Sequence, residues 1–112
     1  MEAIVSTYAG DADLVPIVME FVSCLPERIR AMRNDLSSGS FADLERLAHQ
    51  LKGAGGSYGY ACLTDAAREL ESYAKGEDAE AAMLALNTLT HICERVQAGH
   101  EMNSVSQDAR KT

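Results

Sequence analysis

A chain of 112 residues has room for one small domain with a single core. Apolar residues make up 46% of it and aromatic residues only 5%, with no tryptophan, which favours a helical core over a β-sandwich rich in β-branched and aromatic side chains. The net charge of −7 offers no basic footprint for nucleic-acid phosphates and no polybasic attraction to anionic membranes. We therefore expect neither nucleic acid nor membrane as a partner.

The sequence predicts neither a targeting segment nor a membrane span. The N-terminus MEAIVSTYAG lacks a basic region followed by an apolar run, and no apolar stretch approaches the roughly 18 residues of a membrane span. The cysteines Cys24, Cys62 and Cys93 are odd in number, have no CxxC spacing and each lie in an apolar helical pattern, so we expect buried free thiols. These features predict a soluble, cytoplasmic protein.

The first long helical pattern follows a short leading helix that we expect over residues 2–9. It begins with Asp13 as N-cap and Pro16 in its first turn, and Gly39 closes it. Its apolar residues keep their phase on both sides of Pro26, so we expect a kink at this proline rather than a helix end. The inward stripe comprises Leu14, Ile17, Val18, Phe21, Leu25, Met32 and Leu36.

Two further helices are predicted before residue 77. The second helix opens at Ser40, with Asp43 completing a weak capping box. The third covers about residues 64–74 and stops at Gly76. Connections as short as these make sequential helices antiparallel neighbours.

The fourth helix is expected to start near Asp78 and to end at about Gly99. The fold class is therefore all-α: an up-down antiparallel four-helix bundle with a short N-terminal helical lead-in, over residues 1–100. Residues 101–112 are polar and aperiodic, and we expect a frayed C-terminal tail there. A monomer is predicted, because no long apolar stripe is left without a partner.

The second helix carries a histidine on the face opposite its core stripe. At about 100° per residue, with His49 at zero, the core residues fall at roughly 160–240°; they are Leu44, Leu47, Leu51, Gly55 and Tyr58. Within roughly 60° of the histidine lie only small or polar residues, namely Ala42, Glu45, Arg46, Lys52, Gly53 and Gly56. His49 is therefore expected to face water.

Four glycines follow this histidine in the run AHQLKGAGGSYG, although a glycine inside a helix costs about 0.5–1 kcal/mol relative to alanine. Gly53 and Gly56 strip side chains from the surface beyond the histidine and leave a bare patch that another protein can approach. Gly55 faces inward, which suits close contact between helices. Gly59 is interpreted as the residue that ends the helix.

Lys52 places a cation where an anion attached to the imidazole would sit, so the pattern indicates a nucleophilic histidine that accepts a phosphoryl group. The run AHQLKGAGGSYG resembles the histidine-phosphotransfer (HPt) signature, in which A-H-x-L-K-G precedes small residues and a further glycine. The resemblance extends over nearly the whole domain and departs at two positions: Gly56, where bulkier small residues are usual, and Tyr58, where an aliphatic residue is usual. It implies that His49 accepts the phosphoryl group, with Lys52 as electrostatic partner. The expected docking surface comprises Gly53, Gly56, Gln50, Glu45 and Arg46.

The resemblance also implies a relay. A response-regulator receiver domain, or a hybrid sensor histidine kinase, would pass a phosphoryl group from an aspartate to His49, and often on to another receiver. Such a transfer consists mostly of in-line positioning and charge neutralisation. The chain has no nucleotide-binding or kinase motif, so we expect a phosphoryl carrier rather than an enzyme, with no cofactor of its own. Mg²⁺ is expected on the partner receiver.

Two alternatives stay open. A non-catalytic helical adaptor would dock a signalling partner through the glycine patch without chemistry. An HPt module of a larger histidine kinase would have the same fold but a kinase ATP-binding domain as phosphate donor; the initiating Met1 and short ends favour a free-standing protein. His91 and His100 are interpreted as solvated side chains, and no pair of ligands has zinc-site spacing.

Overall fold

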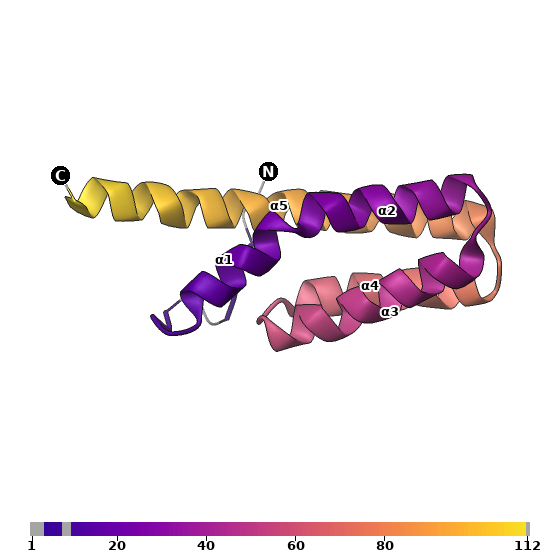
Figure 1. Ribbon diagram of the computed structural model, residues 1–112, viewed down its shortest axis with the longest axis horizontal. Coiled ribbons are helices and arrows are strands. Elements are labelled where there is room, and N and C mark those ends of the chain that lie inside the picture. The colour runs from indigo at the N-terminus through magenta and orange to yellow at the C-terminus, as the bar shows by residue number, and fades with distance from the viewer. Residues whose placement is uncertain (1–3, 8–9, 112) are drawn as a thin grey trace.

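The part of the chain that this computed structural model describes, residues 4–7 and 10–111 with side chains up to residue 99, forms five helices (Figure 1). They are α1 (Val15–Ser23), α2 (Leu25–Ser37), α3 (Phe41–Ser57), α4 (Ala61–Lys75) and α5 (Ala79–Lys111). The four helices α2 to α5 run alternately in opposite directions (Figure 1). The predicted all-α, up-down four-helix bundle is confirmed.

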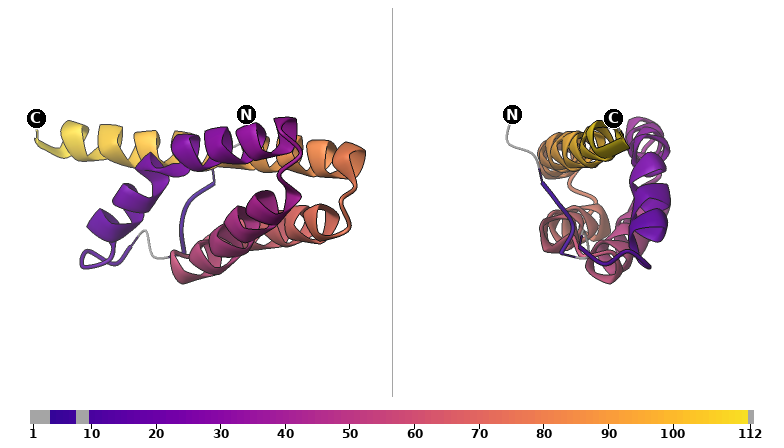
Figure 2. Two further views of the ribbon diagram at one scale, coloured as in Figure 1. Left: turned by 45° about the vertical axis from the view of Figure 1, so that its right-hand side comes forward. Right: turned by 90° about the vertical axis from the view of Figure 1, so that its left-hand side faces the viewer.

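Two layers of helices enclose the core. α2 and α5 lie side by side in one layer and α3 and α4 in the other, as both Figure 1 and the end-on view of Figure 2 show. Contacts join neighbours around the bundle, and those between α3 and α4 are the most extensive. Leucines from all four helices dominate the buried centre: Leu25, Leu44, Leu51, Leu63, Leu70, Leu86 and Leu89.

Pro26 separates two helices, which corrects the prediction of one kinked helix. α1 ends at Ser23, and α2 begins at Leu25 with the proline in its first turn. Proline cannot donate a backbone hydrogen bond and its ring clashes with the preceding turn, but neither effect is costly in the first turn of a new helix. α1 therefore leaves at an angle to α2 (Figure 1). Ile17 on this peripheral helix is exposed instead of joining the core.

The N-terminal segment is not helical where it is described. A leading helix is predicted over residues 2–9, but residues 4–6 lack regular structure and Thr7 is in a turn; the rest of that range lies outside the described residues. Ile4 donates its N–H to a backbone carbonyl of α5 at 2.9 Å, and Thr7 donates to the carbonyl of Gly59 at 3.0 Å. These bonds to distant segments take the place of a local helix, so the segment crosses the end of the bundle (Figure 2).

Neither of the two predicted N-cap side chains makes a capping hydrogen bond. The N-cap of α1 is Leu14, and Asp13 instead donates its N–H to the carboxylate of Asp11 at 3.0 Å. Ser40 is the N-cap residue of α3 as predicted, but its hydroxyl lies 3.1 Å from that of Ser38 and makes no capping bond. The predicted capping box therefore does not form.

Helix ends are marked by residues with positive φ. Gly39 (φ 73°) and Gly59 (φ 83°) follow α2 and α3, as predicted. The turn at Gly59 leads directly into α4, which begins about three residues earlier than predicted. α4 also stops at Gly76 as predicted, but the residue with positive φ is the next one, Glu77 (φ 55°). A left-handed residue with a side chain is strained by about 1–2 kcal/mol, so Glu77 is a local weak point.

We expect Glu77→Gly to raise the free energy of unfolding by up to about 1 kcal/mol, because glycine removes the strain at positive φ and a negative charge leaves the C-terminus of a helix. Urea unfolding at neutral pH measures the change. Gly39→Ala, at the equivalent turn after α2, is the control: it places a Cβ at positive φ and should lower the free energy of unfolding. A Glu77→Gly protein that unfolds at lower urea concentration would contradict this prediction.

The last helix is longer than predicted. It starts after Asp78, whose carboxylate accepts the N–H of Ala81 at 3.1 Å, and it continues through Gly99 to Lys111. Gly99 does not end the helix: a Cβ there would collide with the backbone of Ile4, so the glycine provides clearance for the N-terminal segment. The division into a domain of residues 1–100 and a tail of residues 101–112 stays a prediction. Among the described residues no helix, α5 included, is long and apolar enough to cross a bilayer.

The three cysteines are free thiols in different environments. Cys93 is buried as predicted, Cys62 is partly buried, and Cys24 is exposed at the junction of α1 and α2, where the helix break turns it outward. The prediction of three buried thiols is therefore confirmed for Cys93, only partly met by Cys62 and wrong for Cys24. Burial raises the pKa of the Cys93 thiol to about 12, so this thiol stays protonated and unreactive at neutral pH.

Candidate functional site

His49 lies in the middle of α3 on the face that was predicted to meet solvent. Its side chain is 66% exposed, while Leu44 and Leu51 are buried on the opposite side of the helix. His91 on α5 is similarly exposed, and among the described residues its nearest carboxylate oxygen is that of Glu94 on its own helix, at 4.0 Å. The side chain of His100 lies outside the described residues. The helical-wheel argument for an exposed His49 is confirmed.

A carboxylate from α4 joins the histidine to the lysine. The Nδ1 atom of His49 lies 2.7 Å from Oε2 of Glu71, and Nζ of Lys52 donates a hydrogen bond to Oε1 of the same carboxylate at 2.7 Å. The Glu71 side chain is only 19% exposed. The three residues form one connected cluster, the His49–Lys52–Glu71 cluster, in which Lys52 is held by a partner rather than free in solvent.

Glu71 is ionised at neutral pH. The hydrogen bond from Lys52 lowers the pKa of the carboxyl group below its ordinary value of 4.5, outweighing partial burial, which acts in the opposite direction, and the bond to His49 lowers it further. Because the folded-state pKa is depressed, the stabilisation is fully present above pH 4.5 and is lost as the pH falls through the lowered value. The cluster therefore contains a carboxylate throughout the physiological pH range.

Close packing of α4 on α3 brings Glu71 to the histidine. Gly55 is buried, and a Cβ at this position would lie 3.0 Å from the backbone nitrogen of Thr64, so the predicted helix–helix contact is confirmed. The Thr64 hydroxyl donates to the carbonyl of Lys52 at 2.7 Å. Glu71 follows Thr64 by seven residues, or two helical turns, and so lies on the same face of α4. The contact at Gly55 thus places Glu71 opposite His49.

The surface beyond His49 is bare at Gly53. A Cβ at this exposed position would meet nothing within 4 Å, so packing does not require this glycine. At Gly56 a Cβ would be in ordinary contact, at 3.5 Å from the Thr64 hydroxyl. The other predicted docking residues lie on or near the same surface: Gln50 is exposed, Arg46 is exposed and paired with Asp43 at 3.3 Å, and Glu45 is half-buried.

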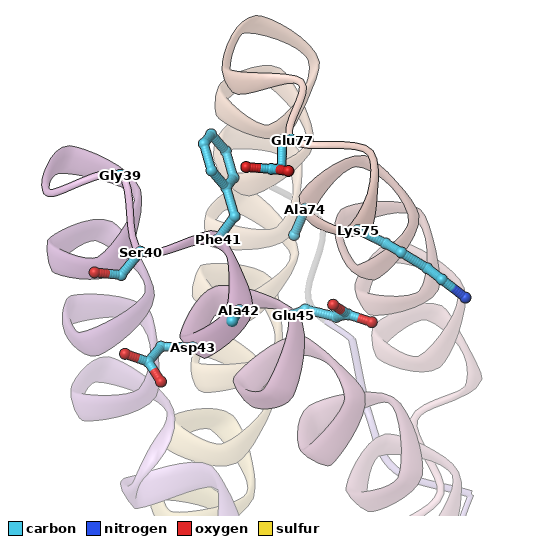
Figure 3. Close-up of a pocket in the computed structure, with 9 residues that line it drawn as sticks. All are labelled: Gly39, Ser40, Phe41, Ala42, Asp43, Glu45, Ala74, Lys75 and Glu77. Carbon is cyan, nitrogen blue, oxygen red and sulfur yellow. The ribbon is translucent and has the colours of Figure 1, made fainter.

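Two neighbouring hollows open on the α3–α4 side. The one beside the histidine has a volume of about 380 Å³ and is lined by Glu45, His49, Lys52, Arg68, Glu71, Ser72 and Lys75. A larger one, of about 470 Å³, lies at the end of the bundle between the start of α3 and the end of α4 (Figure 3) and shares Glu45 and Lys75 with the first. In Figure 3 the side chains of Ser40 and Asp43 point away from Phe41 and Glu77. The polar groups converge only in the smaller hollow, so that is the candidate site.

A family model described as the Hpt domain matches residues 16–99, which is 84 of the 112 residues. The chain belongs to the Hpt domain family. Hpt domains are phosphocarrier modules that act in histidine phosphotransfer and interact with receiver domains and histidine kinases. Comparisons with curated proteins and with solved structures found no match.

Glu71 is the site residue of this Hpt domain that sequence reasoning missed. It lies in the charged run ARELESYAKGEDAE, which is interpreted from the sequence as a solvated face and loop. One signal was available: the residue sits between the buried Leu70 and Ala74, at the border of the core stripe. Its partner is 22 residues away on another helix, so helical periodicity alone does not connect the two.

The departure at Tyr58 from the usual Hpt pattern has a packing explanation. The Tyr58 ring stacks on Phe21 of α1, with ring centroids 4.6 Å apart and planes inclined by 15°. Its backbone carbonyl also accepts a hydrogen bond from the Ser6 hydroxyl at 2.6 Å. An aromatic ring at this position therefore ties α1 to the end of α3.

Proposed function

We propose that this Hpt domain accepts a phosphoryl group on His49 from the aspartyl phosphate of a receiver domain and passes it to an aspartate of another receiver. The observation that carries the proposal is the 2.7 Å contact between Nδ1 of an exposed His49 and the carboxylate of Glu71. This contact decides which ring nitrogen is free to react.

The reactive atom follows from the charge of Glu71. An ionised carboxylate only accepts hydrogen bonds, so the Nδ1 atom of His49 must carry the proton and donate it. In the neutral imidazole the lone pair then belongs to Nε2. With the ring mostly exposed, this nitrogen is available to a partner protein. The cluster thus prepares Nε2 as the nucleophile.

The transfer balances without a further reactant. The Nε2 lone pair attacks phosphorus, a P–N bond forms, the P–O bond to the receiver aspartate breaks, and the electron pair leaves with that carboxylate. The Nδ1 proton stays in place, so the product ring is an imidazolium whose positive charge faces the carboxylate of Glu71. In the onward transfer an aspartate of the next receiver attacks phosphorus, the P–N bond breaks, and its electron pair returns to Nε2 of a neutral imidazole.

Lys52 has two roles in this proposal. Its hydrogen bond holds Glu71 ionised and oriented. Its ammonium group also borders the hollow beside His49, where it offsets the charge of an arriving phosphoryl group. Mg²⁺ belongs to the receiver in this scheme, and the Hpt domain supplies the nucleophile without a cofactor or a nucleotide site of its own.

The receiver is proposed to dock over Gly53 and Gly56, with Gln50, Glu45 and Arg46 at the margin. Support comes from the open space at Gly53, where a side chain is missing although nothing in the fold excludes one. The protein is expected to act as a monomer, which light scattering would test.

Gly53→Ala should stabilise the protein by up to about 1 kcal/mol, because alanine is the better helix former and its Cβ meets no atom. Gly53→Gln should gain a similar amount from helix propensity but project beside the imidazole at i+4. We expect it to slow transfer from a receiver much more than phosphorylation by the small donor phosphoramidate. Melting curves and transfer rates measure both effects. Lower melting temperatures for both variants would contradict the interpretation of Gly53 as a residue kept for access.

The function itself is tested by incubating the protein with a phosphorylated receiver in Mg²⁺. Acid-labile, alkali-stable phosphate on the protein is the expected result, followed by its appearance on a second receiver. Binding of the receiver without any transfer would favour the non-catalytic adaptor. Labelling only by a kinase domain with ATP, and by no phosphorylated receiver, would favour a module of a larger histidine kinase.

A further inference from the structure

A row of polar side chains on α4 borders the reactive histidine. Arg68, Glu71, Ser72 and Lys75 recur at i, i+3, i+4 and i+7, which places them on one face of the helix, and all four line the hollow beside His49. The 2.7 Å contact of Glu71 with the imidazole shows where this face lies relative to the ring. Arg68 lies one turn before Glu71 and Lys75 one turn after it, so each cation flanks the position of the histidine.

Among the described residues, Arg68 forms only a weak ion pair and Lys75 forms none. Arg68 lies 3.2 Å from Asp65, but both side chains are mostly exposed, and such a pair contributes little. Lys75 has no ion pair with any residue that the structure describes. Its side chain extends outward in Figure 3, with the ammonium group apart from the carboxylates of Glu45 and Glu77. An acidic protein thus presents two available cations at one hollow.

We propose that Arg68 and Lys75 bind the phosphoryl group while it is on His49, and that together with Lys52 they form a three-cation site. The inference rests on the proposed function of His49. Lys52 offsets only part of the phosphoryl charge, because its ammonium group is also paired with Glu71 at 2.7 Å. A phosphoryl dianion on the ring therefore needs further cations, and the α4 face supplies one on each side. To reach the phosphoryl group, Arg68 has only to break its exposed i,i+3 pair with Asp65.

A three-cation site should stabilise the phosphohistidine in the free protein, before any receiver is bound. The equilibrium ratio of phosphohistidine to receiver aspartyl phosphate depends on the free proteins and not on how they dock. Removing a cation should therefore lower this ratio, by about two- to five-fold for each exposed charge. It should also raise the pH at which the phosphoryl group gains its proton, because the dianion loses a nearby positive charge.

The experiment uses the full chain with Arg68→Gln, Lys75→Gln and the double variant. Arg30→Gln is the matched control: Arg30 is 65% exposed against 62% for Arg68, and it also forms an i,i+3 pair, with Glu27, but it lies on α2 away from the hollow. Equilibration with a phosphorylated receiver gives the ratio. Labelling with phosphoramidate, followed by a ³¹P NMR titration, gives the protonation midpoint of the phosphoryl group.

We expect both single variants to lower the ratio and raise the midpoint, the double variant to do so more strongly, and the control to match the wild type. The difference should shrink in high salt, where exposed charges are screened. A wild type that is labelled on His49, with a double variant equal to the control in ratio and midpoint, would overturn this inference and leave the proposed function standing. A wild type that neither donor labels would overturn the proposed function itself.

Discussion

His49→Gln should abolish phosphoryl transfer from a receiver while the protein keeps its fold and its melting temperature within about 1 °C, since an exposed side chain contributes little to packing. Glutamine retains polarity and helix propensity but has no nucleophilic ring nitrogen. The loss should be complete for both a receiver and phosphoramidate, because both reactions need the same Nε2 atom. Labelled phosphate on the intact protein measures the transfer, and circular dichroism melts measure the stability.

The matched control is His91→Gln. His91 is 63% exposed on a helix, close to the 66% of His49, but no carboxylate of the described residues lies within hydrogen-bond distance of it, and no lysine is near it in the sequence. Its replacement should leave transfer unchanged. If His91→Gln loses the label and His49→Gln keeps it, the assignment of the site is wrong.

Glu71→Ala should slow transfer by about ten-fold, by analogy with the loss on removing a carboxylate that orients a metal-binding histidine. Without the carboxylate, Nδ1 of His49 has no acceptor, so the ring loses its fixed orientation and its preferred proton position. The imidazolium product also loses its counter-charge. We expect ¹⁵N NMR of the imidazole to show protonation moving from Nδ1 toward Nε2, together with the slower transfer.

The pH dependence of stability distinguishes this role from a general loss of packing. The depressed pKa of Glu71 means that the wild type should be more stable than Glu71→Ala at pH 7, and that the difference should shrink as the pH falls below 4.5 through the lowered value. Glu69→Ala is the control, because Glu69 is an exposed acid on the same helix outside the cluster. A stability difference that persists undiminished at low pH, with an unchanged ¹⁵N spectrum, would show that Glu71 does not orient the ring.

In the proposed transfer, the position of Glu71 beside His49 depends on how closely two helices pack. Gly55 admits the α4 backbone at Thr64, and from there two helical turns lead to Glu71. The run of glycines in α3 therefore serves two different ends. Gly55 contributes to the position of the carboxylate that contacts the imidazole, and Gly53 leaves the outer surface open. A single sequence motif thus links the inner packing of the bundle to the access of a partner.

Much of this protein could be predicted from residues that are close together in the sequence. The spacing of apolar residues predicts the helices of the bundle and the exposed face on which His49 and Lys52 lie side by side, because the α-helical period converts sequence distance directly into an angle. The ends of α2 and α3 at Gly39 and Gly59 follow from the conformational freedom of glycine, which is also a local property.

The tertiary structure decided what depends on distant segments. Glu71 meets His49 across 22 residues because two helices pack at a particular register, which no single-helix pattern contains. Gly99 has the sequence signature of a helix end, but it lies inside α5, where the backbone of Ile4 passes over it and leaves no room for a Cβ. In both cases the decisive contact joins segments that are far apart in the sequence and meet only on folding. Hydrophobic periodicity and turn preferences describe only residues that are close together in the sequence.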